Sequence, residues 1–387
     1  MDGWWTSGQY SQVLARGLAR FVGVRHALLT NSGSSANLLA VSSLTSGRLE
    51  EGRLRPGDEV VVCATSFPTT VNPILQNRLV PVLADVTIGD YNISPAALRH
   101  AITSRTRAIM IAHTLGNPFD LDVVMEIARR HHLWVIEDAC DAMGAEWDGR
   151  LIGSFGDLAT ASFYPAHQMT TAEGGAVYTN SSKLKVLVES FRDWGRDCWC
   201  DTGCDNTCGK RFGWSFGALP SGYDHKYTYS HIGYNLKMTD IQAAIGIAQL
   251  ARLEGFVEQR QRNFSILHKR LSDLIDRIIL PNSHPKANPS WFGYPITLRR
   301  GETPPRSEVI AHLEARGVRT RVLFSGNLLR QPAYKDSSLR VAGPLDNADY
   351  VMNNTFWVGV YPALGPDSMH YIADTLHDAL NGKVVQR

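Results

Sequence analysis

Apolar residues recur with helical spacing in some stretches of the chain and form short continuous runs in others. Residues 7–22 and 32–44 carry helical spacing, and residues 26–31 form an apolar run of strand length between them. Further runs of this kind lie at 58–65, 80–86, 107–113, 132–139, 159–164 and 174–180, with helical stretches such as 95–102 and 121–131 between them. Strands that alternate with helices form mainly parallel sheets covered on both faces, so the pattern predicts an α/β fold.

The pattern changes after a helix expected at 183–194. Residues 196–232 show neither a helical nor a strand period, and we expect an ordered loop there, called the cysteine loop below because four cysteines lie in it. A long helical pattern follows at 238–271, and beyond it strands mix with helices again. The sequence therefore predicts a large domain over residues 1–255, which includes the cysteine loop, and a smaller domain over 256–387.

Composition and charge narrow the classes of function that fit this chain. The 387 residues carry a net charge of +2, from 39 basic and 37 acidic side chains, and contain no basic run. No apolar stretch approaches the ~20 residues of a membrane span, and the first ten residues lack the features of a signal peptide. We therefore expect no nucleic-acid or membrane partner, a cytoplasmic location and chemistry on a small molecule.

Two sites at the ends of predicted strands suggest a cofactor. Gly33, Ser34 and Ser35 lie where a strand meets a helix, and the N–H groups at a helix start can hold a phosphate. Asp138 ends another strand, at the edge of the sheet where such folds bind ligands. Taken alone, each has a plainer interpretation: a capped helix start at Gly33, Ser34 and Ser35, and a helix cap or a surface charge at Asp138.

Four of the six cysteines crowd into the cysteine loop: Cys198, Cys200, Cys204 and Cys208. A reducing compartment disfavours structural disulfides. The local spacing alone is compatible with zinc, with an iron–sulfur cluster, or with spare thiols beside a pair.

Five motifs occur together in an order that resembles the DegT-type sugar aminotransferases and dehydratases: NSGSSAN, TSFPTT, VIEDACDA, SFYPAHQMTTAEGGAV and GYNLKMTDIQAAIG. The resemblance spans nearly the whole chain. It implies the fold of the fold-type-I transferases that use pyridoxal phosphate (PLP), with a large, mainly parallel sheet domain and a smaller C-terminal α+β domain.

The resemblance also implies roles for single residues. Ser34, Ser35 and Ser162 would hold the coenzyme phosphate, Phe67 would stack on the coenzyme ring, and Asp138 would face the pyridine nitrogen, as would be expected of an electron-sink coenzyme. Asn235 would reach the phosphate of a neighbouring subunit, which implies a homodimer. Asp141 departs from the His or Gln that many relatives carry, and its role stays open.

His167 occupies the position where family aminotransferases carry the lysine that binds PLP, and no lysine occurs from 151 to 177. Pyridoxamine phosphate (PMP), or PLP held without a covalent bond, is then the expected coenzyme. PMP would form a ketimine with a keto sugar, and His167 would remove a proton as general base, leading to loss of water. The alternatives are a PLP-dependent C4 aminotransferase and a non-catalytic coenzyme-binding sensor.

One branch of the family, the CDP-4-keto-6-deoxyhexose 3-dehydrases, carries a C-x57-C-x-C-x7-C pattern for a [2Fe–2S] cluster. Cys140, Cys198, Cys200 and Cys208 match all three spacings, which leaves Cys63 and Cys204 free. The resemblance implies C3 deoxygenation of a nucleotide-linked 4-keto-6-deoxy sugar. The electrons would come from an NAD(P)H-dependent flavin or iron–sulfur reductase.

Part of the cysteine loop is also a candidate for substrate contacts. We expect five residues there to line the substrate site, with a solvated aromatic loop as the alternative: His225, Lys226, Tyr227, Tyr229 and His231. The resemblance favours CDP as the nucleotide and leaves dTDP open. The sequence does not decide whether the sugar keeps its C2 hydroxyl.

Overall fold

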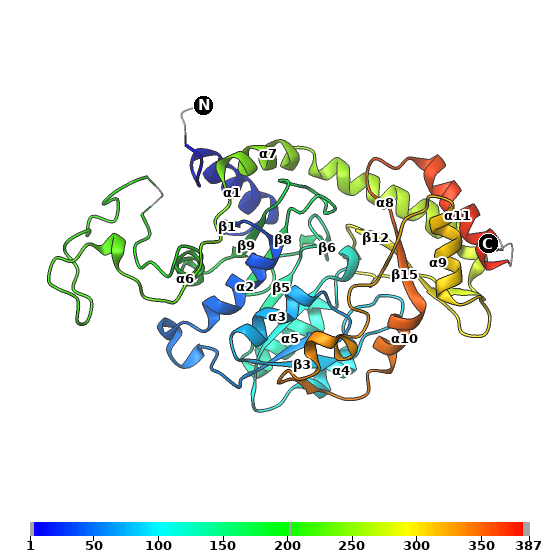
Figure 1. The fold of residues 1–387 in the computed structure, drawn as a ribbon, viewed down its shortest axis with the longest axis horizontal. Helices are drawn as coiled ribbons and strands as arrows, with labels where there is room; N and C mark the ends of the chain where they lie inside the picture. Colours follow the sequence, from blue (N-terminus) through cyan, green and yellow to red (C-terminus); the bar gives the residue numbers. More distant parts are fainter. Residues whose placement is uncertain (1–3, 201–202, 382–387) are drawn as a thin grey trace.

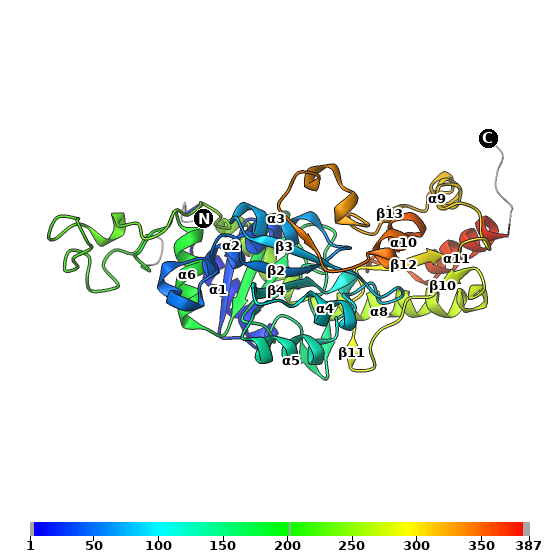
Figure 2. The same ribbon diagram turned by 90° about the horizontal axis from the view of Figure 1, so that it is seen from below.

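A computed structural model describes residues 4–200 and 203–381. Its centre is an eight-stranded sheet in the order β1-β9-β8-β5-β4-β2-β3-β14 (Figures 1 and 2). All of its strands run parallel except β9, which is antiparallel to both β1 and β8. The strands span His26–Thr30 (β1), Glu59–Cys63 (β2), Val80–Ala84 (β3), Thr106–Ala112 (β4), Trp134–Asp138 (β5), Leu158–Ser162 (β8), Gly175–Thr179 (β9) and Arg340–Val341 (β14).

Helices cover this sheet, because its strands are apolar on both faces. Every residue of β2, β8 and β9 is buried, as expected for a sheet packed on both sides. The helices of this part span Gln9–Val22 (α1), Gly33–Leu44 (α2), Pro68–Gln76 (α3), Pro95–Ala101 (α4), Leu121–His131 (α5), Ser182–Arg192 (α6) and Asp240–Leu250 (α7). The strands and helices expected from the sequence are therefore present here.

A second, smaller core lies at the other end of the molecule (Figure 1). It surrounds an antiparallel sheet in the order β10-β12-β15-β13. Its elements span Leu253–Arg270 (α8), Ile278–Ile279 (β10), Gly293–Leu298 (β12), Arg306–Ala315 (α9), Thr320–Val322 (β13), Thr355–Gly359 (β15) and Pro366–Leu380 (α11), while Asp346–Asn354 forms α10. A three-stranded sheet, β11-β6-β7, consists of Ala287–Asn288 (β11), Glu146–Trp147 (β6) and Arg150–Leu151 (β7).

Two features of the structure concern the long helical pattern and the C-terminal segment, and the domain boundary near residue 255 stays a prediction. The long helical pattern at 238–271 divides into α7 and α8, with a break at Ala251 and Arg252. Part of the C-terminal segment returns to the large sheet: β14 pairs with β3, and Leu323, Leu328 and Val351 join the main core. The C-terminal segment is thus shared between the two cores.

The cysteine loop projects from the body of the molecule and is seen in green at the left of Figure 1. Its described residues contain one short 3-10 helix, His225–Tyr227. The prediction of an ordered loop fits this description. In the described part of the chain, no helix has the length and apolar character needed to cross a bilayer.

Candidate active site

Asp138 lies at the C-terminal end of β5 and is 5% exposed. Its Oδ2 accepts hydrogen bonds from Asn37 Nδ2 at 2.9 Å and Thr70 Oγ1 at 2.6 Å, and its Oδ1 accepts from the Cys140 N–H at 3.2 Å. The neighbouring carboxylate, Glu137, instead accepts backbone N–H groups of a turn. Asp138 is therefore the carboxylate that is fixed in place at the sheet edge.

The start of α2 packs directly against the end of β8. Ser32 caps the helix, and its Oγ accepts from the Ser35 N–H at 3.0 Å. A Cβ atom added at Gly33 would lie 2.5 Å from Ser162 Cβ and 3.0 Å from Cys140 Sγ, so only glycine fits there. The close approach brings the free N–H groups of a 12-residue helix next to a hydroxyl of β8, which is a suitable cradle for a phosphate.

An exposed aromatic ring stands near this edge. Phe67 precedes α3 and remains 51% exposed, and its ring meets that of Phe324 edge-on at 6.2 Å between centroids. Such an exposed ring can stack on a planar ligand.

His167 lies in the segment between β8 and β9, and its side chain is 14% exposed. Burial lowers the pKa of its imidazole to about 4, against an opposing effect of the Asp138 charge. Nδ1 lies 3.4 Å from Asp141 Oδ1, but the angle does not make a hydrogen bond. Burial and the Asp138 charge raise the pKa of Asp141 to about 7. The imidazole is therefore neutral at neutral pH and can accept a proton.

Two side chains hold the His167 segment in place. The buried Arg260 of α8 donates to the carbonyl groups of Ala166 and His167 at 3.1 and 3.2 Å. Gln168 Nε2 donates to the carbonyl of Ser290 at 2.9 Å and also contacts the carbonyl of Asp141. These bonds fix the backbone that carries His167 between the two cores, as a positioned base requires.

His167 faces a cleft of about 1180 Å³ between the large sheet and the smaller core. Aromatic side chains line it together with arginines, among them Tyr164, Phe292, Trp357, Arg252, Arg319 and Arg321. Among the described residues, neither Arg252 nor Arg321 forms an ion pair with an acidic side chain, whereas Arg319 pairs with Glu314. The cleft is large enough for a sizeable ligand and offers positive charge to an anionic one.

Comparison with known proteins decides the family. One family, described as DegT/DnrJ/EryC1/StrS aminotransferases, matches residues 1–377. The chain belongs to this family. A DegT/DnrJ/EryC1/StrS relative, the lipopolysaccharide biosynthesis protein RfbH of Salmonella typhimurium, is 53% identical over 98% of this chain and 86% of its own length. The dTDP-4-dehydro-2,6-dideoxy-D-glucose 3-dehydratase of Saccharopolyspora spinosa is also 53% identical, over 92% of this chain and 77% of its own length.

Solved structures agree with this assignment to the DegT/DnrJ/EryC1/StrS family. A GDP-4-keto-6-deoxymannose-3-dehydratase with bound GDP-perosamine superposes with a TM-score of 0.87 at 26% identity, covering 96% of this chain and 94% of its own. The DesV protein of S. venezuelae, in complex with a ketimine intermediate, superposes with a TM-score of 0.83 at 26% identity. The match covers 97% of this chain and 91% of the DesV chain. The predicted fold-type-I transferase fold and the prediction of an enzyme are confirmed.

The residues at the sheet edge fit the PLP-type coenzyme that the DegT/DnrJ/EryC1/StrS family implies. The cradle at Gly33 leaves no room for a side chain, Ser34 is exposed beside it, and Asp138 is fixed by three hydrogen bonds. Phe67 supplies a free ring. The phosphate, the pyridine nitrogen and the ring face of such a coenzyme would therefore each find a partner among the described residues.

Asn235 is exposed and does not join this cradle. Its Oδ1 accepts from Lys237 Nζ at 2.6 Å, and its backbone bridges to Asp193. Its predicted contact with the phosphate of a neighbouring subunit remains a prediction.

The structure brings three of the four predicted cluster cysteines together. The Cys200 thiol contacts those of Cys198 and Cys208, and Cys200 Sγ accepts from the Cys208 N–H at 3.4 Å. Cys140 instead lies at the coenzyme site, next to Gly33, and its described contacts include none of the loop cysteines. Within one chain, the four-cysteine set is therefore not assembled. Cys204 is exposed and Cys63 is buried.

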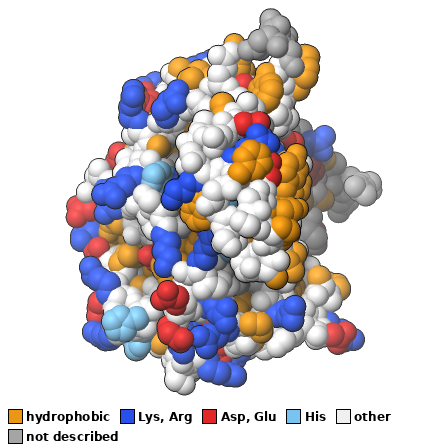
Figure 3. All heavy atoms as spheres, turned by 90° about the vertical axis from the view of Figure 1, so that its left-hand side faces the viewer, with side chains coloured by type: hydrophobic (Ala, Val, Ile, Leu, Met, Phe, Trp, Pro, Cys, Tyr) orange, Lys and Arg blue, Asp and Glu red, His pale blue; other side chains and the backbone are white. Residues whose placement is uncertain are grey.

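None of the five expected substrate residues lines the His167 cleft of the same chain. His225 is wholly buried, His231 bonds to Ser46 and Ser190, and Lys226 pairs with Asp205. Tyr227 and Tyr229 are exposed, and hydrophobic side chains gather on the face of the molecule that carries this loop (Figure 3). A substrate role for these residues stays a prediction that depends on a neighbouring subunit.

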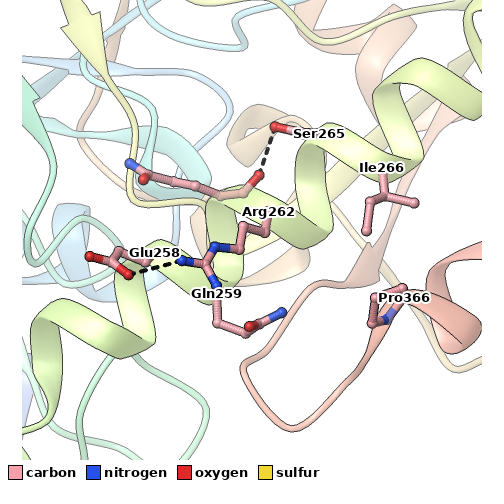
Figure 4. Close-up of a pocket in the computed structure, with 7 residues that line it drawn as sticks. Glu258, Gln259, Arg262, Ser265, Ile266 and Pro366 are labelled. Carbon is pink, nitrogen blue, oxygen red and sulfur yellow. Dashed lines mark hydrogen bonds and ion pairs between the residues drawn. The ribbon is translucent and has the colours of Figure 1, made fainter.

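A separate hollow along α8 holds no comparable chemistry (Figure 4). Its charged side chains, Glu258 and Arg262, pair with each other at 3.3 Å on an exposed face. The His167 cleft therefore remains the candidate for chemistry.

Sequence reasoning missed several contributors to the site: Asn37, Thr70, Asp141 as the neighbour of His167, and Arg260. NSGSSAN and TSFPTT already contain Asn37 and Thr70. A buried carboxylate such as Asp138 needs hydrogen-bond donors, so the polar Asn37 and Thr70 in these motifs could have been predicted as its partners. Arg260 left no local signal, since it acts on backbone carbonyls far along the chain.

Proposed function

We propose that this chain is an NDP-4-keto-6-deoxyhexose 3-dehydratase that achieves C3 deoxygenation. The observation that carries the proposal is a buried, neutral His167 at the position where the resemblance places a lysine in family aminotransferases. The relative from S. spinosa, named as a sugar-nucleotide 3-dehydratase, supports the same assignment.

PMP supplies, when bound, a primary amine that reacts with the 4-keto group and a conjugated ring that takes up electron density. Ser34, Ser35 and Ser162 would hold its phosphate. Asp138 would keep the pyridine nitrogen protonated, and the bonds from Asn37 and Thr70 fix the orientation of its carboxylate.

His167 acts as the general base in this proposal. Its neutral imidazole accepts a proton from the methylene carbon of the coenzyme. Asp141, 3.4 Å from Nδ1, stabilises the positive charge that the imidazole then gains. No amine competes at this position, so the bound sugar loses its C3 hydroxyl as water instead of being released as an amino sugar.

The overall reaction balances with two electrons and two protons. The C3–O bond breaks, the oxygen leaves as water, and a C3–H bond forms. An NAD(P)H-dependent flavin or iron–sulfur reductase would provide the two electrons, and a [2Fe–2S] cluster, when bound, would supply one-electron transfer. The enzyme is proposed to be a homodimer in which Asn235 reaches the partner's coenzyme phosphate.

The nucleotide diphosphate is proposed to bind in the cleft beside His167, where Arg252 and Arg321 offer unpaired positive charge. CDP is the proposed nucleotide. dTDP is the second candidate, because the S. spinosa relative is named for a dTDP sugar.

The test is turnover of CDP- and dTDP-4-keto-6-deoxyhexoses, each with and without the C2 hydroxyl, under anaerobic conditions with PMP, NADH and a reductase. We expect a product that has exchanged the C3 hydroxyl for hydrogen. A 4-amino sugar formed from PLP and glutamate would support the aminotransferase alternative. Coenzyme binding without turnover of any of these sugars would support the sensor.

A further inference from the structure

Three cysteines of the cysteine loop already lie together. The Cys200 thiol contacts those of Cys198 and Cys208, and among the described residues the hollow between them is lined only by loop residues from 198 to 226. A [2Fe–2S] cluster takes four cysteine ligands. The spacing pattern gives the fourth position to Cys140, which is not part of this hollow.

Cys140 lies in the body of the same chain. It follows β5, and in the large sheet β8 and β9 separate β5 from the edge strand β1. The cysteine loop leaves the body on the β1 side and projects outward from it (Figures 1 and 2). The loop of one chain therefore points away from its own Cys140.

The base of the loop carries Asn235. Asp193 bridges to Asn235 and Arg196 bridges to Tyr229, so the two ends of the loop run antiparallel beside each other. The described contacts of Asn235, to Asp193 and Lys237, lie outside its own coenzyme cradle. In the proposed homodimer, on which this inference rests, Asn235 reaches the partner's coenzyme phosphate. A loop anchored at Asn235 is then carried to the same site of the partner.

Cys140 lies beside that phosphate cradle. A Cβ atom added at Gly33 would lie 2.9 Å from Ser162 Oγ and 3.0 Å from Cys140 Sγ. The thiol is free and partly exposed. The Cys140 N–H also donates to Asp138 Oδ1 at 3.2 Å. A ligand group held by Cys140 is thus next to the coenzyme, where one-electron transfer requires it.

The described part of the loop also exposes apolar side chains that a second copy can cover. Trp199 is 45% exposed, Phe212 60% and Ile232 96%. Hydrophobic side chains gather on this face of the molecule (Figure 3). Exposed apolar patches of this kind mark contact surfaces. The second chain of the proposed homodimer is the occupant that fits this face.

We propose that each iron–sulfur cluster is shared between the two subunits. Cys198, Cys200 and Cys208 of one chain hold it together with Cys140 of the partner subunit. The four-cysteine set is complete in this arrangement, although one chain alone does not assemble it. Each homodimer then carries two clusters, one beside each coenzyme, and cluster assembly requires the dimer.

The test is the iron content of hybrid dimers. Cys140→Ser and Cys198→Ser chains with different affinity tags are produced together, and dimers that carry both tags are isolated anaerobically. A shared cluster leaves one intact site in this hybrid, built from the unchanged loop of the first chain and the unchanged Cys140 of the second. We expect about two irons per hybrid dimer, against about four in the wild type, and the electron paramagnetic resonance signal of a reduced [2Fe–2S] cluster. Each variant alone should hold little iron.

The matched control pairs Cys140→Ser with Cys204→Ser, on the exposed cysteine of the same loop. This hybrid keeps one intact site whether the four ligands come from one chain or from two. Iron in it therefore shows that chains with Cys140→Ser fold and assemble. A second test pair, Cys140→Ala with Cys208→Ser, repeats the comparison with different side chains.

An iron-free hybrid of Cys140→Ser with Cys198→Ser, beside a control that holds iron, would overturn the proposal, because the ligands would then come from one chain. Full iron in the Cys140→Ser homodimer would overturn it as well, because the loop would then complete the cluster itself. Zinc in place of iron in the wild type would have the same effect. The readout is independent of turnover. If the hybrid holds its cluster but no sugar nucleotide is dehydrated, the shared cluster stands and the proposed function fails.

Discussion

The Nδ1 atom of His167 lies 3.4 Å from the Oδ1 atom of Asp141, and the two side chains are only 14% and 13% exposed. Burial moves the pKa of His167 down to about 4 and that of Asp141 up to about 7. Burial thus disfavours the charged form of each group when the other is neutral. Once His167 is protonated, however, the carboxylate of Asp141 is close enough to stabilise its positive charge. The motif VIEDACDA alone left the role of Asp141 open. Its distance to His167 gives Asp141 a place in the site.

The first prediction concerns His167 itself. His167→Asn should still bind PMP, because the phosphate and ring contacts lie on other residues. Removal of a general base typically costs ~10²–10⁴ in rate, so exchange of the coenzyme methylene proton with solvent should slow by that factor. Exchange followed by NMR with substrate present provides the measurement. A wild-type exchange rate in the variant would exclude His167 as the base.

His167→Lys gives the reciprocal prediction. A primary amine at this position can bind PLP covalently, so we expect a visible absorbance band that borohydride makes irreversible, and a shift of turnover toward transamination. The Asn variant, treated identically with PLP and borohydride, is the control and should retain no bound coenzyme after denaturation.

The third prediction follows from the raised pKa of Asp141. A group that holds its proton more tightly when folded contributes stability that is complete below its unfolded pKa of 3.8 and is lost as the pH rises to about 7. Relative to Asp141→Asn, the coenzyme-free wild type should therefore lose free energy of unfolding across this interval, by at most about 1.4 kcal/mol per pH unit. Urea titrations at several pH values measure the difference. Parallel pH curves for the two proteins would contradict it.

The fourth prediction tests the proposed shared sites. Asn235→Ala and His167→Asn should each be inactive alone. After subunit exchange, one of the two sites in each hybrid dimer carries neither lesion, so activity should return. Absence of recovery, with hybrid dimers demonstrated by differently tagged chains, would place Asn235 in its own subunit's structure.

The fifth prediction concerns the cleft. Arg321→Ala should raise KM for the sugar nucleotide by about tenfold or more with little change in kcat, because a bond to a charged group is typically worth ~1.5–3 kcal/mol. Arg262→Ala, on the hollow along α8, is the control and should leave KM unchanged. Equal values for wild type and Arg321→Ala would remove the cleft from nucleotide binding.

Much of this structure follows from local patterns. The apolar runs gave the strands, and the polar residues just beyond them, such as Asp138 and the serines of α2, lie at the sheet edge as parallel topology requires. What the sequence did not reveal depends on contacts between distant segments. Thr70 and Asn37 meet Asp138 across 68 and 101 residues, and the buried Arg260 reaches back to the carbonyl of His167. Periodicity carries no information on such pairs.

The positions of the cysteines also depend on contacts between distant segments, which the sequence does not reveal. The resemblance to one family branch groups Cys140 with the loop cysteines, while within one chain the fold places Cys140 beside Gly33.

The return of the chain to the large sheet has a consequence for biosynthesis. β14 adds Arg340 and Val341 to the edge beside β3, and Arg340 forms an ion pair with the buried Glu59 at 2.9 Å. On the ribosome, the N-terminal part emerges first, with that edge strand uncovered and Glu59 lacking this partner. Exposed sheet edges favour pairing with other chains. Slow translation or truncation between residues 255 and 340 should therefore lead to aggregation of nascent chains.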